Sequence, residues 1–288
     1  MPTKLEKDEI TGKATTGHEW DGIQEFDTPL PKWWVYVFYA CILSSVIVFI
    51  LYPAIPGITG YTKGVLGTTA RQSLTGELAI ARAAQAKYLD RIKTASLEEI
   101  NKDTDLRDFA KAGGKAAFAD NCVPCHAQGG AGQRGYPSLA DDVWLWGGTL
   151  AEIEKTLLIG IRFSEGSRAS QMPRFGIDNV LTAKQIDDVA EYVLSLTDRA
   201  KDKEAVARGA RIFAEQCAAC HGKTGAGDQK QGAPALNDQV WLYGGSKADI
   251  VAQITSPHMG VMPAWGGRLD PTTIKMLTIY VHSLGGGK

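Results

Sequence analysis

The chain has 288 residues, of which 44% are hydrophobic and 22% are charged, and its formal net charge is −1 at pH 7. A chain of this length accommodates about two domains with linking segments. The near-balance of charges excludes the broad basic surface on which nucleic-acid binding depends, so we predict no nucleic-acid partner.

The chain opens with a polar, mildly acidic tract, residues 1–32, that lacks the basic start and the cleavage site of a removed signal peptide. Residues 33–52 follow without a charged side chain, and about 20 such residues cross a hydrocarbon core of about 30 Å. Trp33, Trp34 and Tyr52 stand at its ends, where interfacial aromatic belts form. We predict a transmembrane helix over this segment, in preference to a buried helix of a soluble protein.

Residues 53–105 are predicted to link this helix to the rest of the chain. The first part contains glycine and proline and indicates a loop leaving the membrane. Residues 75–100 are rich in Ala, Glu, Lys, Arg and Leu, which predicts a helix. We assign no chemistry to this linker, and we interpret Cys41, within the predicted span, as a small apolar residue.

Four of the five cysteines fall in two pentapeptides of the form Cys-x-x-Cys-His. This is the attachment pattern of c-type haem, in which both thiols form thioethers and the histidine becomes the proximal iron ligand. A thioredoxin-like redox pair or half of a zinc site are the rival interpretations, but neither explains the histidine in both copies. We predict two covalently bound haem c groups, with no cysteine pair left for a structural disulfide. The residues concerned are Cys122, Cys125 and His126, and Cys217, Cys220 and His221.

The pentapeptides belong to a longer repeat that predicts two domains of one fold, residues 106–198 and 205–288. A Gly-x-x-x-Phe segment precedes both pentapeptides, as Gly114–Phe118 and Gly209–Phe213. Glycine and phenylalanine at this spacing share one helix face. The repeat therefore predicts that a first helix in each domain makes a close contact with another helix.

Helix starts are predicted from capping patterns at four positions: Thr149, Thr182, Ser246 and Asp270. The last helix of each repeat carries a tyrosine, Tyr192 or Tyr280. First and last helices that cross at a Gly/aromatic contact resemble those of class I cytochrome c. The predicted fold is thus mainly α, with one N-terminal transmembrane helix followed by two tandem class I cytochrome c domains.

A second axial ligand is expected on a loop before each last helix, and Met172-Pro173 and Met262-Pro263 stand there. Thioether sulfur is a soft ligand that raises the potential of haem iron, and the following proline stiffens the loop. We predict Met172 and Met262 as the axial ligands opposite the histidines, rather than as fillers of gaps in the core. The sequence leaves open whether each methionine serves the haem of its own repeat or that of the other.

Several other residues are considered as iron ligands, propionate partners or crevice residues. His258 and Met259 are rivals to Met262, but the first repeat has no equivalent, and His18 and His282 are interpreted as non-ligands. Arg134 and Arg174 are candidates for haem propionates, with solvated arginines as the alternative. The aromatic residues expected either to line the haem crevices or to pack in the core are Trp144, Trp146, Trp241, Tyr243 and Trp265.

The N-terminal tract carries a family resemblance. His18-Glu-Trp-Asp-Gly-Ile-Gln24 and Pro29-Leu-Pro31-Lys-Trp-Trp34 precede one span and two haem domains that contain Trp-x-Tyr/Trp-Gly-Gly and Met-Pro-Ala-Trp265 motifs. Together they resemble the dihaem cytochrome c subunit, subunit III, of the cbb(3)-type, C-family haem–copper oxidases. The resemblance covers essentially the whole chain. One departure is that a single span is present, whereas some members have two.

The resemblance implies an electron-transfer subunit that is not an enzyme on its own. It would accept electrons from a donor cytochrome c and pass them to the monohaem subunit and the catalytic haem–copper subunit, which reduces oxygen to water with proton pumping. Haem attachment outside the bacterial inner membrane places the domains after residue 52 in the periplasm and residues 1–32 in the cytoplasm. The alternatives are a stand-alone membrane-anchored dihaem shuttle and a dihaem peroxidase; the second needs an open iron position, which paired methionines argue against.

Overall fold

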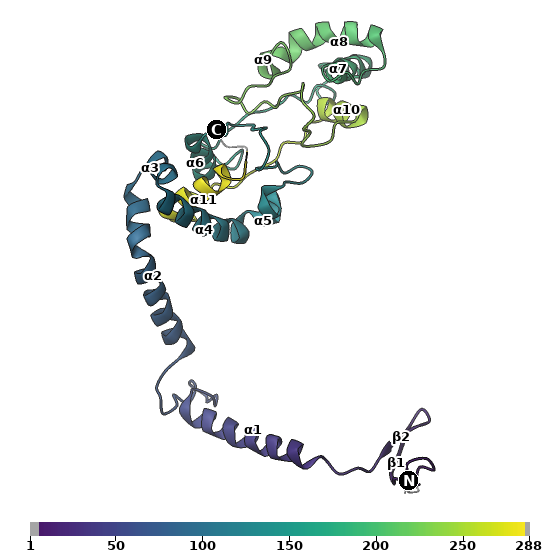
Figure 1. Cartoon of the computed structure of the whole chain (residues 1–288). Coiled ribbons are helices and arrows are strands. Elements are labelled where there is room, and N and C mark those ends of the chain that lie inside the picture. The colour runs from purple at the N-terminus through teal and green to yellow at the C-terminus, as the bar shows by residue number, and fades with distance from the viewer. Residues whose placement is uncertain (1–5, 286–288) are drawn as a thin grey trace. The chain divides into compact units, whose positions relative to one another are not determined.

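A computed structural model of the chain describes residues 6–285, so the first five residues of the predicted cytoplasmic tract and the last three of the second predicted domain lie outside the described part. The chain divides into two compact units, residues 1–84 and 85–288. Figure 1 shows that helices dominate, with one short pair of strands near the N-terminus. The predicted mainly α fold with one candidate membrane helix is confirmed.

The first unit begins with a hairpin that the sequence analysis does not predict. Strands β1 (Thr15–Trp20) and β2 (Ile23–Phe26) pair antiparallel, with Trp20 opposite Ile23. Asp21 and Gly22 form the turn with φ of 52° and 83°. Positive φ at both turn residues suits the right-handed twist of the strands, and Asp-Gly is a favoured sequence for such a turn.

Helix α1 (Lys32–Leu51) follows, and it matches the predicted span to within one residue at each end. It is the one helix among residues 6–285 that is long and apolar enough to cross a membrane, and none of its side chains is buried. An apolar helix with no buried face has no protein core to explain its composition, which favours a lipid environment.

The remaining helices carry the two pentapeptides and their supports. The linker helix expected over residues 75–100 is longer at its start and breaks at Ser96, whose side chain and Glu99 form a capping box. The bounds are α2 (Ala70–Thr94), α3 (Leu97–Lys102), α4 (Thr104–Asn121), α5 (Val123–His126), the 3₁₀ turn η1 (Gln128–Gly130), α6 (Leu150–Ile159), α7 (Ala183–Ser195), α8 (Lys203–Gln216), α9 (Ala218–His221), α10 (Lys247–Thr255) and α11 (Pro271–His282).

The four predicted capping residues are confirmed as helix N-caps. Thr182 and Ser246 form complete capping boxes with Gln185 and Asp249. Thr149 accepts the backbone N–H of Glu152, and Asp270 accepts those of the first turn of α11. Each cap satisfies backbone donors that the helix itself cannot pair, so these starts are fixed locally by sequence.

The first and last helices pair across the repeats. Helix α11 packs on α4 and helix α7 packs on α8, as Figure 1 shows. A Cβ at Gly114 would strike the carbonyl of Met276 and the side chain of Tyr280, and one at Gly209 would strike the carbonyl of Asp188. Both glycines therefore allow the close helix contact that the repeat predicts, but the partner helix comes from the other repeat.

Complementary side chains specify this crossed pairing. In the second pair, Asp188 of α7 accepts two hydrogen bonds of 2.9 Å from the guanidinium of Arg208 on α8. At the equivalent positions of the first pair, Met276 of α11 lies against Gly113 of α4. An uncrossed arrangement would set the Met276 thioether against Arg208 and leave buried Asp188 without its guanidinium, which costs free energy.

A second set of equivalent positions repeats the pattern. Glu191 of α7, buried, binds Lys247 of α10 at 2.9 Å and accepts the backbone N–H of Lys201 at 3.0 Å. Their counterparts Ile279 and Leu150 belong to one buried apolar cluster. The α7–α10 contact is therefore charged and the α11–α6 contact is apolar. Exchanging the partners would place a buried charge against an apolar side chain, which disfavours the uncrossed pairing.

The C-terminal end of α2 is built into the second unit through buried Ile92, which shares an apolar cluster with Ile100 and Met276. Lys275 of α11 donates to the carbonyls of Ala95, Lys93 and Ile92 at 2.6, 3.1 and 3.3 Å. A lysine that binds the last carbonyls of a helix satisfies acceptors that would otherwise be orphaned. The C-terminal end of α2 is therefore anchored to the same helix that packs on α4.

Candidate haem sites

The first pentapeptide lies where α4 ends. Cys122 caps α4 and is buried, and the single turn α5 carries Cys125 and His126. The Nδ1 atom of His126 lies 3.0 Å from the carbonyl oxygen of Pro137. A carbonyl that accepts the Nδ1 proton fixes the tautomer and leaves Nε2 for iron. Burial lowers the pKa of His126, which favours the neutral ring that a metal requires.

The second pentapeptide repeats this geometry. Cys217 caps α8, α9 carries Cys220 and His221, and the Nδ1 atom of His221 lies 3.0 Å from the carbonyl oxygen of Pro234. Burial lowers the pKa of His221 as well. The two proline carbonyls are not among the predicted site residues, although a proline stands at the same place in both repeats.

The environment of two cysteines argues against a thioredoxin-like redox pair. Burial raises the pKa of the Cys122 and Cys217 thiols to about 11. Reactive thiols of redox pairs have lowered pKa values instead.

The first pentapeptide faces a cluster drawn from both repeats. Cys122 and Phe118 are buried with residues of α6 and α11, and Met262 packs against this cluster. The cluster comprises Phe118, Cys122, Ile153, Leu157, Trp265, Ile274, Leu277 and Val281. The methionine beside the first pentapeptide is therefore that of the second repeat.

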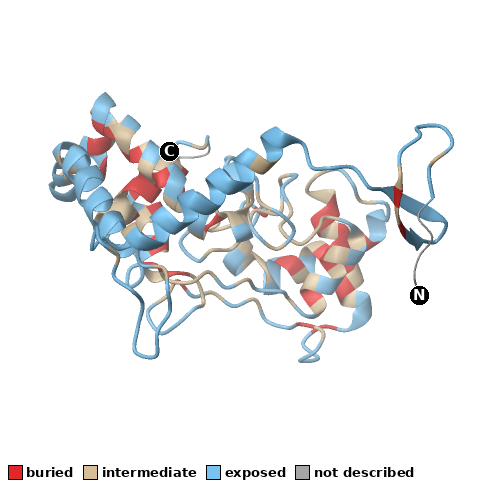
Figure 2. Cartoon of the chain, turned by 90° about the horizontal axis from the view of Figure 1, so that it is seen from below, coloured by how far each residue is buried: buried red, intermediate tan, exposed pale blue. Residues whose placement is uncertain are grey.

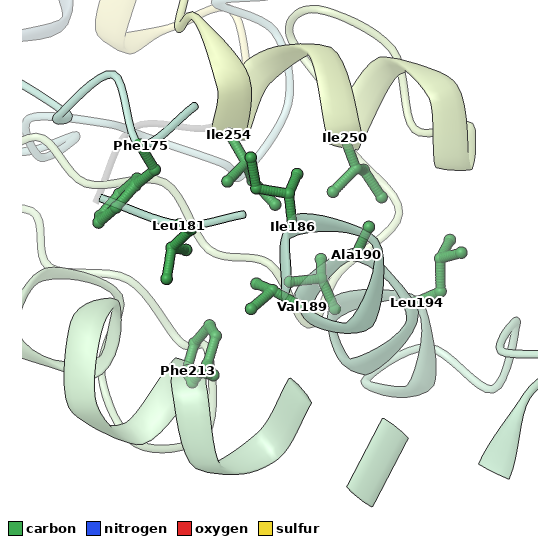
Figure 3. Close-up of a cluster of buried hydrophobic side chains, with 10 residues drawn as sticks. Phe175, Leu181, Ile186, Val189, Ala190, Leu194, Phe213, Ile250 and Ile254 are labelled. Carbon is green, nitrogen blue, oxygen red and sulfur yellow. The ribbon is translucent and has the colours of Figure 1, made fainter. Parts of the chain in front are cut away.

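The second pentapeptide faces a cavity of about 420 Å³ that Cys217, Cys220, His221 and Met172 line. Several side chains that line this cavity belong to the buried cluster drawn in Figure 3, in which Phe213 of α8 faces the side chains of α7 and α10. Figure 2 shows the buried positions gathering where the helices pack. Met172 packs against this cluster, so the methionine of the first repeat lies beside the second pentapeptide.

The rival residues lie at the second pentapeptide as well. His258 and Met259 line the same cavity as Met172, and both are exposed. Because Met262 packs against the cluster around Cys122, His258 and Met259 do not share its site. His258 is instead held by Gln253, whose Oε1 lies 2.9 Å from its Nδ1. His18 lies on β1, near Glu25 at 3.6 Å.

The aromatic residues serve both roles that the sequence left open. Trp241 and Tyr243 line the second cavity, whereas Trp144 and Trp265 belong to the cluster around Cys122. The buried Nε1 of Trp241 has no hydrogen-bond partner among the described residues. A buried donor is costly when unpaired, and a carboxylate of haem would satisfy it, so this pocket fits the group. Trp146 stacks beneath the guanidinium of Arg168, at 5.2 Å.

The two candidate propionate ligands pair with carboxylates in the structure. Arg134 binds Asp249 at 2.7 Å, and Arg174 binds Asp178 at 2.7 Å. Both guanidinium groups are more than half exposed. Their arrangement agrees with the solvated alternative.

Three family models match the chain. The model described as "N-terminal domain of cytochrome oxidase-cbb3, FixP" matches residues 12–59. The model "Cytochrome c" matches residues 111–197, and "Cytochrome C oxidase, cbb3-type, subunit III" matches residues 204–281. The hairpin and α1 thus belong to a recognised N-terminal domain, and each pentapeptide lies in a cytochrome c domain.

Full-length relatives agree with these matches. The chain is 52% identical over 291 residues to the cbb3-type cytochrome c oxidase subunit CcoP of Azospirillum sp. (strain B510), with 98% of both chains covered. It is 48% identical over 290 residues to the subunit FixP of Bradyrhizobium sp. (strain ORS 278), with both chains covered completely. Such similarity along the whole length assigns the chain to the CcoP/FixP family of cbb3-type cytochrome c oxidase subunits, membrane-anchored c-type cytochromes with two covalently attached haems.

Proposed function

We propose that this chain relays electrons from a donor cytochrome c to the monohaem and catalytic subunits of a cbb3-type oxidase and performs no substrate chemistry itself. The supporting observation is that each pentapeptide lies beside a methionine, Met262 or Met172, in a largely apolar pocket. Haem iron with two protein ligands exchanges electrons one at a time and leaves no position for a substrate. Oxygen reduction and proton pumping then belong to the catalytic subunit.

The proposed axial pairs are His126 with Met262 and His221 with Met172. The thioethers at Cys122, Cys125, Cys217 and Cys220 hold the two haems. The proline carbonyls fix both histidine rings, and apolar side chains around each site exclude water. A soft thioether ligand and a low-dielectric pocket both favour the reduced state, so the haems suit a relay near the high-potential end of a respiratory chain.

The proposed location is the bacterial inner membrane, with α1 in the lipid bilayer, the haem domains in the periplasm and residues 1–32 in the cytoplasm. Support comes from the exposed apolar surface of α1 and from the periplasmic site of haem attachment. Protease added to spheroplasts is expected to remove haem-stained material and spare the N-terminus. Haem-stained material that survives in spheroplasts would contradict this orientation.

Oxygen uptake tests the relay role. Deleting this subunit should abolish oxygen uptake driven by reduced cytochrome c in membranes, while the remaining subunits are followed by haem stain and immunoblot. The matched variant replaces residues 1–34 with a neutral signal-anchor and keeps both haems. Its oxygen uptake should fall together with the amount of catalytic subunit that co-purifies. Unchanged uptake after the full deletion would disprove the relay.

A stand-alone dihaem shuttle for another periplasmic redox enzyme is the second candidate. The hairpin and α1 match the N-terminal domain of the oxidase family, which favours the oxidase. Purification in mild detergent separates the two, because the shuttle would leave the membrane without the oxidase subunits.

A further inference from the structure

The loop before Met172 is longer than its counterpart in the second repeat. Helices α6 and α10 begin 97 residues apart, at 150 and 247, whereas Met172 and Met262 lie 90 apart. The first repeat therefore carries seven additional residues between the start of its middle helix and its methionine: one in the helix, which has ten residues against nine, and six after it. These six fall within residues 160–171, which we call the insertion loop.

The start of the insertion loop is bonded to the backbone around Met262. The N–H of Ile161 donates to the carbonyl of Met262 at 2.9 Å, and the N–H of Met262 donates to the carbonyl of Ile161 at 3.0 Å. Gly160 has φ of +68°, and a Cβ there would lie 2.7 Å from the nitrogen of Ala264. The insertion loop and the Met262 loop are therefore in close backbone contact.

The side chain of Arg162 extends this contact to both methionine loops. Its Nε donates to the carbonyl of Gly260 at 2.8 Å, and its Nη1 lies 3.4 Å from the carbonyl of Ser170. Gly260 stands two residues before Met262, and Ser170 stands two residues before Met172. One guanidinium thus contacts the same backbone position ahead of each methionine.

The backbone of Arg162 supports a specific role. Its φ is +51°, a left-handed and strained conformation that non-glycine residues rarely adopt. Neighbouring bonds hold the residue there, since its N–H donates to the carbonyl of Arg168 at 2.8 Å. Arg162 also lines the cavity of the second haem site.

We propose that Arg162 is a positioning residue that ties the Met172 and Met262 loops together, so that axial ligation at the two haems is mechanically coupled. This inference rests on the proposed crossed ligand pairs. The guanidinium of Arg162 is planar and carries several N–H donors in fixed directions, so it can hold two carbonyls at once.

The experiment uses the full-length protein with both haems and observes one methionine at a time. In Met172→Ala, only the first site keeps its methionine-to-iron absorption signature. In Met262→Ala, only the second site keeps it. Arg162→Gln is then added to each background. We expect a partial loss of the remaining signature in both, together with increased binding of carbon monoxide to the reduced protein.

Arg174→Gln is the matched control, because Arg174 is two residues after Met172 but binds only Asp178 among the described ion pairs. It should leave the first-site signature in the Met172→Ala background unchanged. If Arg162→Gln alters only the second site, Arg162 acts locally, on that haem or its loop, and the coupling is disproved.

Failure of the ligand assignment and failure of the Arg162 proposal give different results. If Met172→Ala and Met262→Ala alone each leave both signatures intact, the ligand assignment fails before Arg162 is tested. If Arg162→Gln does not accumulate with two haems, Arg162→Lys carries the same test, since it keeps the charge but can reach one carbonyl at a time. It should weaken the remaining signature in both single-methionine backgrounds relative to the same background with Arg162 intact, and an unaffected first site would overturn the proposal.

Discussion

The ring of Phe118 meets the ring of Tyr280 at a centroid distance of 5.3 Å, so the first helix of the first repeat is closed by the last helix of the second. The reciprocal contact joins Phe213 and Tyr192 at 4.9 Å. Aromatic pairs at such distances contribute about 0.5–1.5 kcal/mol beyond the area they bury. The two haem sites therefore depend on each other for a wall of their pockets.

The crossed ligand pairs predict the behaviour of a single-haem variant. Replacing Cys217 and Cys220 with alanine leaves haem attached only at the first pentapeptide. In that background, Met262→Ala should remove the methionine-to-iron signature, because Met262 packs beside Cys122. Met172→Ala should leave it intact. The opposite result would establish ligation within each repeat.

Close helix contact predicts a large difference between two neighbouring glycines of α4. A Cβ at Gly114 would meet the backbone carbonyl of Met276, which cannot move without the helix, so Gly114→Ala should destabilise by about 1–3 kcal/mol. A Cβ at Gly113 would meet only the flexible thioether of Met276, so Gly113→Ala should cost less. Denaturant unfolding of the haem-loaded protein measures both, and equal costs would contradict the predicted role of the α4–α11 contact.

The Asp188–Arg208 pair predicts a stability that depends on acid pH. Hydrogen bonds from Arg208, and then from Lys184, lower the pKa of Asp188 to about 2. The stabilisation is therefore complete above the unfolded pKa of about 4 and is lost as the pH falls through about 2. Asp188→Asn should cost about 2 kcal/mol at neutral pH, and the difference should disappear in this window.

Asp187→Asn is the control for that measurement. Asp187 binds Lys247 at 2.8 Å but is half exposed, so its loss should cost at most about 1 kcal/mol. The test compares the thermal unfolding midpoints of the parent protein, Asp188→Asn and Asp187→Asn between pH 2 and pH 7. A penalty for Asp188→Asn that stays constant down to pH 2 would show that the carboxylate charge is not its cause.

Lys275 predicts the stability of the end of α2. Its ammonium group binds three carbonyls there, so Lys275→Met should cost about 1–3 kcal/mol and speed amide hydrogen exchange in the last turns of α2. Lys93→Met removes an exposed charge from the same turn of the helix and should have little effect. Equal exchange in the two variants would argue against the cap.

The local features of the fold could be predicted because their causes are local. The pentapeptides, the four caps and α1 each follow from a few adjacent residues. The same reasoning missed the hairpin, although Asp21-Gly22 is a turn signal. It also overlooked the break at Ser96, where a capping box begins a new helix.

The pairing of helices could not be read from the repeat itself. The Gly-x-x-x-Phe pattern by itself is compatible with either tyrosine-bearing helix, since both repeats carry the same pattern. The residues that distinguish the two pairings differ between equivalent positions of the repeats. Asp188 is replaced by Met276 in the last helix, and Arg208 corresponds to Gly113 in the first helix. The short connection between α7 and α8 was a further signal, because consecutive helices tend to be neighbours.

The position of α11 at the end of the chain has a consequence for biogenesis. If the chain emerges into the periplasm from its N-terminal side, Cys122 and His126 are exported long before Met262 and the helix that covers α4. The second pocket, by contrast, is lined by residues of α7, α8 and α10 and by Met172, all of which emerge before Met262 and α11. The pocket nearer the N-terminus is thus completed last, and every product that stops short of α11 carries a first haem site open to solvent and to outside ligands.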